Sequence, residues 1–161
     1  MGFSTQGLNI NKTLKSGILM LNFNQKTLEI RRWFQHCKSA EEKYRKIMEL
    51  GRLKNPMKAE SKINQNIVMG CQSLMYLETY GKDGLLYFEA ESEALISTGL
   101  GVLLTYAFSG ENPEIVLKES LAYLEELKIP SILTPSRANG LYSIHLRMRQ
   151  EALKHLVANP S

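Results

Sequence analysis

One cysteine in this chain has neighbours that suit chemistry better than packing. It lies directly before a predicted β-hairpin, in the run Asn66-Ile67-Val68-Met69-Gly70-Cys71-Gln72-Ser73. Gly70 lets another segment come close to the backbone, and Gln72 and Ser73 are uncommon in protein cores. The pattern predicts that Cys71 is a nucleophile presented where a loop becomes a strand. The alternative is that Cys71, like many free cysteines, is a small apolar core residue.

A lone reactive thiol suits sulfur transfer better than acyl transfer. A thiolate that attacks the outer sulfur of another protein's persulfide creates no tetrahedral oxyanion, so it needs no oxyanion hole. The reaction needs a thiolate, access for a partner's loop, and shelter of the product persulfide from oxidants and stray thiols. A cysteine on a mobile loop over a cleft meets these requirements.

Other reactive groups are scarce in the sequence. A thiol hydrolase stays open if His145 folds over Cys71, although a histidine at the edge of the core is the alternative. The 3 histidines show no metal-ligand spacing, so we predict no metal site. The sequence has no phosphate loop, Gly-x-Gly-x-x-Gly run or Cys-x-x-Cys motif, so we expect no cofactor bound to this chain. Cys37, beside His36, is assigned no role.

Composition is that of an ordinary globular domain. Of the 161 residues, 43% are hydrophobic and 22% charged, which predicts one domain with a real core. The net charge of +4 is scattered among acids, so we expect no nucleic-acid binding, and no apolar run is long enough for a membrane span. Two lone cysteines fit a reducing compartment, which predicts the cytoplasm. Residues 1–22 are predicted to be a flexible extension and residues 23–158 the domain.

Helical patterns precede the cysteine run. Residues 25–36 place apolar side chains at helical spacing. Ser39 and Glu42 form a capping-box pattern for a second helix that ends at Gly51 or at Asn55-Pro56. Residues 54–66 are polar and are predicted to be a loop that leads to the cysteine.

A hairpin and further helices follow. Residues 74–80 and 85–91 are predicted strands around the turn 81–84. Ser92 is predicted to cap a helix over 93–108, and Asn112-Pro113 to open a short one. The apolar positions of the last predicted helix are Leu141, Ile144, Leu146, Met148, Leu153 and Leu156. This order predicts a single-domain α+β fold, a small antiparallel β-sheet with helices packed on it.

Several short motifs follow one another along residues 25–157. They are Glu41-Glu42-Lys43-Tyr44 with Glu49-Leu50-Gly51, Asn66 with Gly70-Cys71-Gln72-Ser73, Ser92-Glu93-Ala94 with Gly99-Leu100, and Leu133-Thr134-Pro135-Ser136-Arg137 with Gly140-Leu141. In this order and spacing they resemble the SufE-type sulfur acceptors of iron–sulfur cluster assembly. The fold of that family, shared with IscU-type scaffolds, agrees with the fold that the residue pattern predicts.

The resemblance implies a function and partners. Cys71 would receive sulfur from the active-site persulfide of a SufS-type cysteine desulfurase, stimulate that enzyme, and pass the sulfur to a SufB-type scaffold. The chain would be a sulfur-transfer accessory protein rather than a stand-alone enzyme, and pyridoxal phosphate would belong to the partner desulfurase. The sequence leaves open whether two copies form a homodimer.

By the same match, the residues that bind the partner or position the loop are Arg137, Glu93, Asn66, Gly70, Gln72 and Ser73. Arg137 would lie near the desulfurase contact, or would bind nearby carbonyls at the start of a helix. Glu93 would hold the cysteine loop by hydrogen bonds, and Asn66 would fix it by side-chain to backbone bonding. The alternative function is a non-catalytic interaction domain in which Cys71 is buried packing.

Overall fold

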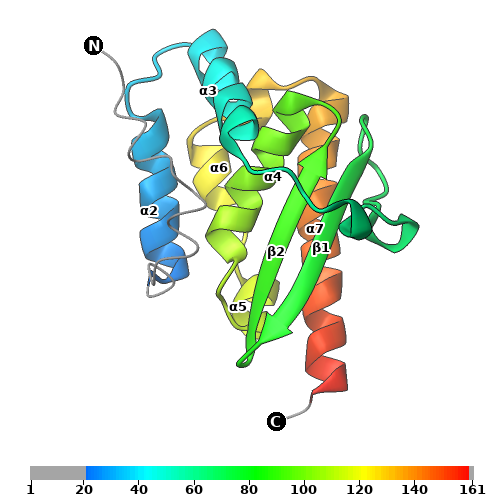
Figure 1. Ribbon diagram of the computed structural model, residues 1–161. Helices are drawn as coiled ribbons and strands as arrows, with labels where there is room; N and C mark the ends of the chain where they lie inside the picture. Colours follow the sequence, from blue (N-terminus) through cyan, green and yellow to red (C-terminus); the bar gives the residue numbers. More distant parts are fainter. Residues whose placement is uncertain (1–20, 160–161) are drawn as a thin grey trace.

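A computed structural model describes residues 21–159 of the chain (Figure 1). The extension predicted for residues 1–22 therefore lies outside the described residues, except for its last two. Of these, Asn22 caps the first described helix, α2 (Phe23–Phe34), by accepting the Gln25 N–H at 2.9 Å. The Gln25 side chain in turn accepts the Asn22 N–H, which completes a capping box.

The second helix, α3 (Ala40–Leu53), begins as predicted. Ser39 accepts the N–H of Glu42 at 3.1 Å. Glu42 in turn accepts the N–H of Lys38, not that of Ser39, so the return bond of the predicted capping box is shifted by one residue. The helix ends just before Asn55-Pro56. The predicted loop that follows contains two short 3₁₀ turns, η3 (Ala59–Ser61) and η4 (Asn64–Asn66).

The predicted hairpin forms, with longer strands and a tighter turn. β1 (Met75–Lys82) pairs antiparallel with β2 (Leu85–Ser92). Only Asp83 and Gly84 form the turn, both with positive φ, as a two-residue type I′ connection requires. Gly81 and Lys82, predicted as turn residues, are therefore part of β1.

Helix α4 (Leu95–Phe108) is the central helix of the core and is buried on nearly every side. The prediction that Ser92 caps it at residue 93 is wrong, because the N-cap position is Ala94. Ser92 instead ends β2 and exchanges hydrogen bonds with Thr98 through its backbone, at 2.9 Å each. The first turn of α4 is thus held by these bonds to the end of the strand, six residues away, and the Ser92 hydroxyl accepts the Ala94 N–H at 3.2 Å.

Of the remaining helices, α7 runs behind β1, whereas α6 lies between α2 and α4 (Figure 1). α5 (Pro113–Lys118) starts at Asn112-Pro113 as predicted, and α6 (Ala122–Glu126) and η5 (Pro130–Ile132) follow. The last helix, α7 (Pro135–Ala158), is capped by Thr134. Leu141, Ile144 and Met148 face the core from α7, whereas Leu146 and Leu153 are exposed.

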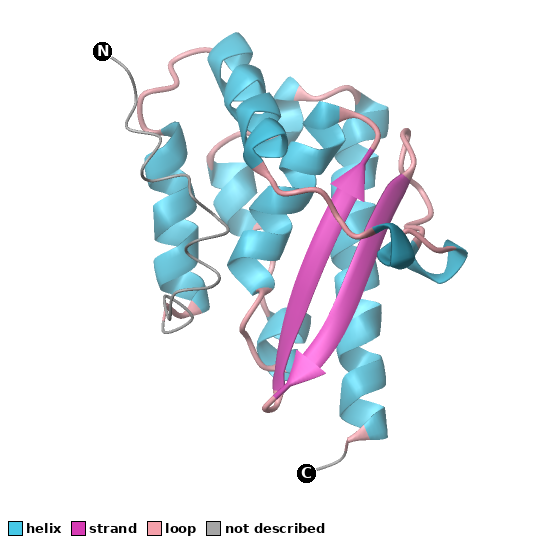
Figure 2. Ribbon diagram, in the orientation of Figure 1, coloured by secondary structure: helices cyan, strands magenta, loops and turns pink. Residues whose placement is uncertain are grey.

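Helices α4 and α7 lie behind the two-stranded sheet, and α2 and α3 pack on the far side of α4 (Figure 2). The apolar side chains of the hairpin, among them Leu77 and Phe88, join those of the helices in one core. The predicted α+β fold, a small antiparallel sheet with helices packed on it in a single domain, is confirmed. Within residues 21–159, no helix is both long and apolar enough to span a bilayer.

The crossing of α3 and α4 requires two glycines. A Cβ on Gly99 would lie 1.9 Å from the carbonyl oxygen of Ile47, and one on Gly51 would lie 2.4 Å from that of Leu95. Backbone atoms cannot yield as a flexible side chain does. The two helices therefore pack backbone to backbone, and this contact fixes the position of α4.

We expect Gly99→Ala to destabilise the protein by about 3 kcal/mol or more, because the new methyl group forces α3 and α4 apart. Urea titration of the helical circular dichroism signal measures this loss. Leu95→Ala, on the exposed side of the same helix, serves as the control and should cost about 1 kcal/mol or less. Equal losses for the two variants would contradict the close helix contact.

Candidate functional site

The cysteine lies in a short loop whose two ends are paired. The Val68 N–H donates to the Met75 carbonyl at 2.9 Å, and Ile67 forms an antiparallel bridge with Tyr76. We call residues 69–74 the Cys71 loop, residues 65–68 its entering arm, and Ser73 with Leu74 its leaving side. The loop therefore projects from the start of β1, as the sequence predicts.

The Cys71 loop and its entering arm lie along one face of α7. The contacts, in order along the helix, are Arg137 with Ser73, Gly140 with Cys71, Ser143 with Gly70, and Arg147 with Ile67. The four helix residues are spaced by three, three and four positions, which places them on one face. A single helix therefore positions the whole cysteine segment.

Gly70 is needed for this close contact. Its φ is +90°, and a Cβ at this position would lie 2.5 Å from Ser143 Oγ. A larger residue would be strained at this φ and would also have to displace the Ser143 side chain. Gly70 permits a close approach to the backbone here, and the approaching element is this helix.

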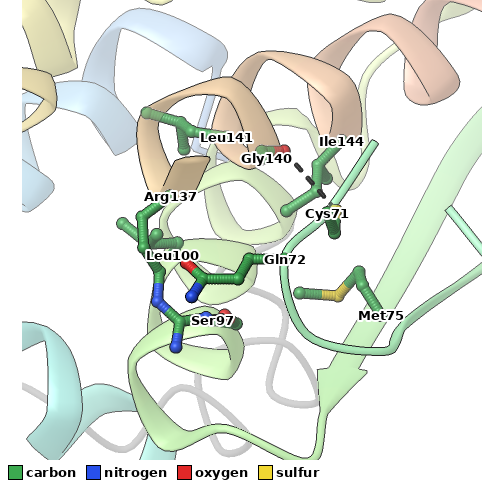
Figure 3. Close-up of a pocket in the computed structure, with 9 residues that line it drawn as sticks. All are labelled: Cys71, Gln72, Met75, Ser97, Leu100, Arg137, Gly140, Leu141 and Ile144. Atoms are coloured by element: carbon green, nitrogen blue, oxygen red, sulfur yellow. Dashed lines mark hydrogen bonds between the residues drawn. The ribbon is translucent and has the colours of Figure 1, made fainter. Parts of the chain in front are cut away.

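A small pocket surrounds the cysteine between the loop, α4 and α7 (Figure 3). Its lining residues are Cys71, Gln72 and Met75 of the loop and strand, Ser97 and Leu100 of α4, and Arg137, Gly140, Leu141 and Ile144 of α7. The cavity volume is about 10 Å³, which is roughly the room that one water-sized group needs. The wall beside the thiol is mainly apolar.

The Cys71 thiol is half-buried and faces α7. Its Sγ donates a weak hydrogen bond to the Gly140 carbonyl at 3.8 Å (Figure 3). Burial raises the pKa of this thiol above its ordinary value, because an apolar wall disfavours the thiolate. With the loop closed, the group is therefore a neutral thiol at neutral pH.

Arg137 connects three elements at the edge of the pocket. Its Nη1 donates to Ser73 Oγ at 2.9 Å and to Ser97 Oγ at 2.5 Å, which links the loop and α7 to α4. Arg137 thus binds hydroxyls rather than the carbonyls that its structural interpretation predicts. Within residues 21–159 it forms no salt bridge, so its positive charge has no carboxylate partner there.

The other predicted loop residues behave differently from one another. Asn66 binds the backbone as predicted, but its Nδ2 donates to the Ser61 carbonyl at 2.7 Å, in the segment before the loop. Glu93 is exposed and forms no hydrogen bond within the described part of the chain, so the predicted hold on the loop is not seen. Gln72 lines the pocket, and Ser73 accepts from Arg137.

His145 does not approach the cysteine. Its ring lies 5.3 Å from that of Phe108, centroid to centroid, at the far end of α4. Burial, and then the charge of Arg149, lower the pKa of His145, while a backbone hydrogen bond with Glu119 opposes them. The Cys–His pair that a thiol hydrolase needs is therefore not formed. Among residues 21–159, no three His, Cys, Asp or Glu side chains gather as a metal would require.

Sequence reasoning missed the second arginine of this site. The guanidinium of Arg147 donates to the Ile67 carbonyl at 2.9 Å and to the Gln65 carbonyl. Ser97 and Ser143, which contact Arg137 and Gly70, were also missed. The sequence places these residues in predicted helices. It does not show which face of each helix meets the cysteine loop, and only that knowledge would have identified them.

The fold and the site define a class of small α+β protein that presents one cysteine on a loop, without a histidine partner. The chain belongs to the SufE family, because the model described as "Fe-S metabolism associated domain" matches residues 28–152. It is therefore a protein of iron–sulfur metabolism.

Similar proteins from other organisms carry the name of the same family. The chain is 32% identical over 120 residues to a SufE-like protein of Synechocystis sp., covering 74% of this chain and 76% of that one. It is 36% identical over 123 residues to one of Rhizobium meliloti, covering 73% and 88%. The Arabidopsis thaliana "SufE-like protein 1, chloroplastic/mitochondrial" is 29% identical over 129 residues, which cover 80% of this chain and 35% of the plant protein.

A solved structure supports the fold. The solution structure of a protein from Thermus thermophilus superposes with a TM-score of 0.67 and covers 82% of this chain and 96% of that one. At 20% sequence identity, the likeness concerns the fold alone.

Because burial disfavours the thiolate, we expect the alkylation of Cys71 by iodoacetamide to rise with pH around a midpoint above the ordinary 9.0. The measurement uses a Cys37→Ser variant, so that only one thiol reacts. The same variant in concentrated urea gives the reference midpoint of an exposed thiol. A folded midpoint at or below the urea value would show that the thiol is not held in the pocket.

Proposed function

We propose that this chain is a sulfur acceptor that takes sulfane sulfur from the persulfide of a SufS-type cysteine desulfurase onto Cys71. It then passes the sulfur to an iron–sulfur cluster scaffold of the SufB type. The observation that carries the proposal is one thiol at the tip of a projecting loop, beside a small apolar pocket. This arrangement supports thiol chemistry that needs no second catalytic group.

The transfer step balances without an oxidant. The Cys71 thiolate attacks the outer sulfur of the donor persulfide, and a new sulfur–sulfur bond forms at Cys71. The bond between the outer sulfur and the donor cysteine breaks, and its electron pair stays on the donor as a thiolate. The proton of the Cys71 thiol goes to solvent or to that leaving thiolate. Release to the scaffold repeats the exchange, with Cys71 as the leaving group.

Removal of the sulfur from the desulfurase explains why the acceptor would stimulate it. The desulfurase cysteine is free for a new turnover only after its persulfide has been emptied. Pyridoxal phosphate does its chemistry in that partner, before the sulfur reaches this chain. We place the exchange in a reducing compartment such as the cytoplasm, where lone thiols persist.

The pocket supports storage of the product. Its volume of about 10 Å³ suits one added atom rather than a second side chain. Met75, Leu100 and Ile144 would face the outer sulfur and keep reductants away from it. Storage and attack therefore need different loop positions, closed for the persulfide and open for the thiolate.

Exposed apolar residues next to the cysteine support docking of a partner at the loop. Met69 is 81% exposed and Leu74 41% exposed, and they flank the loop tip. Large apolar side chains at such exposed positions are typical of contact surfaces. Arg137, which has no carboxylate partner among the described residues, could bind a carboxylate of the desulfurase.

The second candidate is a non-catalytic interaction domain, which the half-burial of Cys71 favours. In that case the thiol would contribute packing, and the desulfurase would be affected by docking alone. The two candidates differ in what loss of the thiol does to sulfur transfer and to stability.

We expect wild-type protein incubated with a SufS-type desulfurase, cysteine and pyridoxal phosphate to gain one sulfur atom on Cys71. Intact-mass analysis before and after dithiothreitol detects this adduct. Cys71→Ser should gain no sulfur and should not stimulate the desulfurase, because an alcohol cannot form a persulfide. Its free energy of unfolding should change by about 1 kcal/mol or less, because the side chain is only half-buried.

Cys37→Ser is the matched control and should behave as the wild type in labelling and stimulation. If Cys71→Ser stimulates the desulfurase as well as the wild type does, the interaction domain is the correct function. If wild type carries no sulfur under turnover, the acceptor role is wrong.

A further inference from the structure

Two arginines of α7 bind the Cys71 loop and its entering arm, one at each end of this stretch. Arg137 binds the leaving side through the hydroxyl of Ser73. Arg147 binds the entering arm through the carbonyls of Ile67 and Gln65. The two residues are ten positions apart on the same helix, and Cys71 lies between them against Gly140.

The contact of Arg147 is located where the loop meets the hairpin. Ile67 is bridged to Tyr76, and its neighbour Val68 donates to Met75. The residues between the two paired positions form the Cys71 loop. A clamp at this point fixes the base of the loop to α7 without touching the thiol itself.

The two arginines differ in their charge environment. The Nε of Arg147 donates to Glu151 Oε1 at 2.9 Å, and both side chains are largely buried, with 20% and 17% exposed. Its charge is therefore neutralised within α7, and its fork is oriented toward the two carbonyls. Arg137 has only hydroxyl partners within residues 21–159, so an incoming carboxylate would compete for it with Ser73.

We propose that Arg147 is a positioning residue that fixes the entering arm to α7 and so holds Cys71 in its pocket. Between docking events the clamp keeps the thiol in its pocket. The benefit of this arrangement for sulfur storage rests on the proposed function. The clamp itself does not, and it can be measured on the free protein.

The test compares Arg147→Gln with Arg149→Gln, both in a Cys37→Ser background. Arg149 is exposed, lies two residues further along α7, and makes no hydrogen bond within the part that the structure describes. The two variants thus lose the same charge from the same helix. We expect Arg147→Gln to raise the rate of Cys71 alkylation by iodoacetamide about tenfold, because it removes charge-assisted hydrogen bonds to the arm. Arg149→Gln should leave that rate unchanged.

Two further variants separate positioning from stability. Arg147→Lys keeps the positive charge but loses the guanidinium group that binds two carbonyls. It should therefore slow the alkylation of Cys71 only part of the way back to the wild-type rate. Glu151→Gln removes the orienting carboxylate and should give a smaller rise than Arg147→Gln. Hydrogen exchange should become faster at the Val68 amide, while core amides of α4 should stay at their wild-type rates.

Equal alkylation rates in Arg147→Gln and Arg149→Gln would overturn the proposal. So would faster exchange throughout the core of Arg147→Gln, because the effect would then be global unfolding. The proposed function is tested separately by the sulfur adduct. If no adduct forms but Arg147→Gln still releases the thiol, the clamp stands and the sulfur-acceptor role fails.

Discussion

The environment of the thiol depends on the contact between the Cys71 loop, with its entering arm, and one face of α7. Because Gly70 and Cys71 lie directly against Ser143 and Gly140, the thiol is turned toward an apolar wall instead of toward water. Its burial and its raised pKa follow from that contact. Any event that lifts the segment off α7 changes the exposure and the protonation of the sulfur together. A docking partner could therefore control reactivity through position alone.

Under the proposed sulfur transfer, the site would meet two opposing demands on one sulfur atom. Storage favours a neutral or sheltered group, whereas attack requires an exposed thiolate. Among the described residues, no charged group offsets the effect of burial on the pKa of Cys71. In the proposed transfer, reactivity would then come from a change in loop position, and the loop and its entering arm are bound to α7 in different ways at their two ends. One end is bound through backbone carbonyls by a charge-neutralised arginine, and the other through a single serine hydroxyl.

The remaining fold keeps the two walls of the site in place. Gly51 and Gly99 let α3 and α4 cross backbone to backbone, which fixes the helix that carries Ser97 and Leu100. The hairpin starts at Met75, directly after the loop, and its buried face packs on the same core. The thiol is thus on a short loop attached to rigid elements.

The sequence by itself determined the local features. The hairpin turn within residues 81–84, the caps at Ser39 and Asn112, and the place of Cys71 before a strand depend on neighbouring residues, so their signals are local. Where a local signal competed with strand pairing, prediction failed, as at Ser92, which ends β2 and binds Thr98 through its backbone instead of capping a helix at residue 93.

Only the tertiary structure decided which side chains surround the sulfur. Arg137 meets Ser97 from 40 positions away, and Arg147 meets Ile67 from 80 positions away, while His145 packs on Phe108 and not on the cysteine. Helical periodicity shows that such residues share a face, but it does not say which loop that face will receive. That depends on how α4, α7 and the hairpin pack, because packing fills the whole core at once and no local pattern records it.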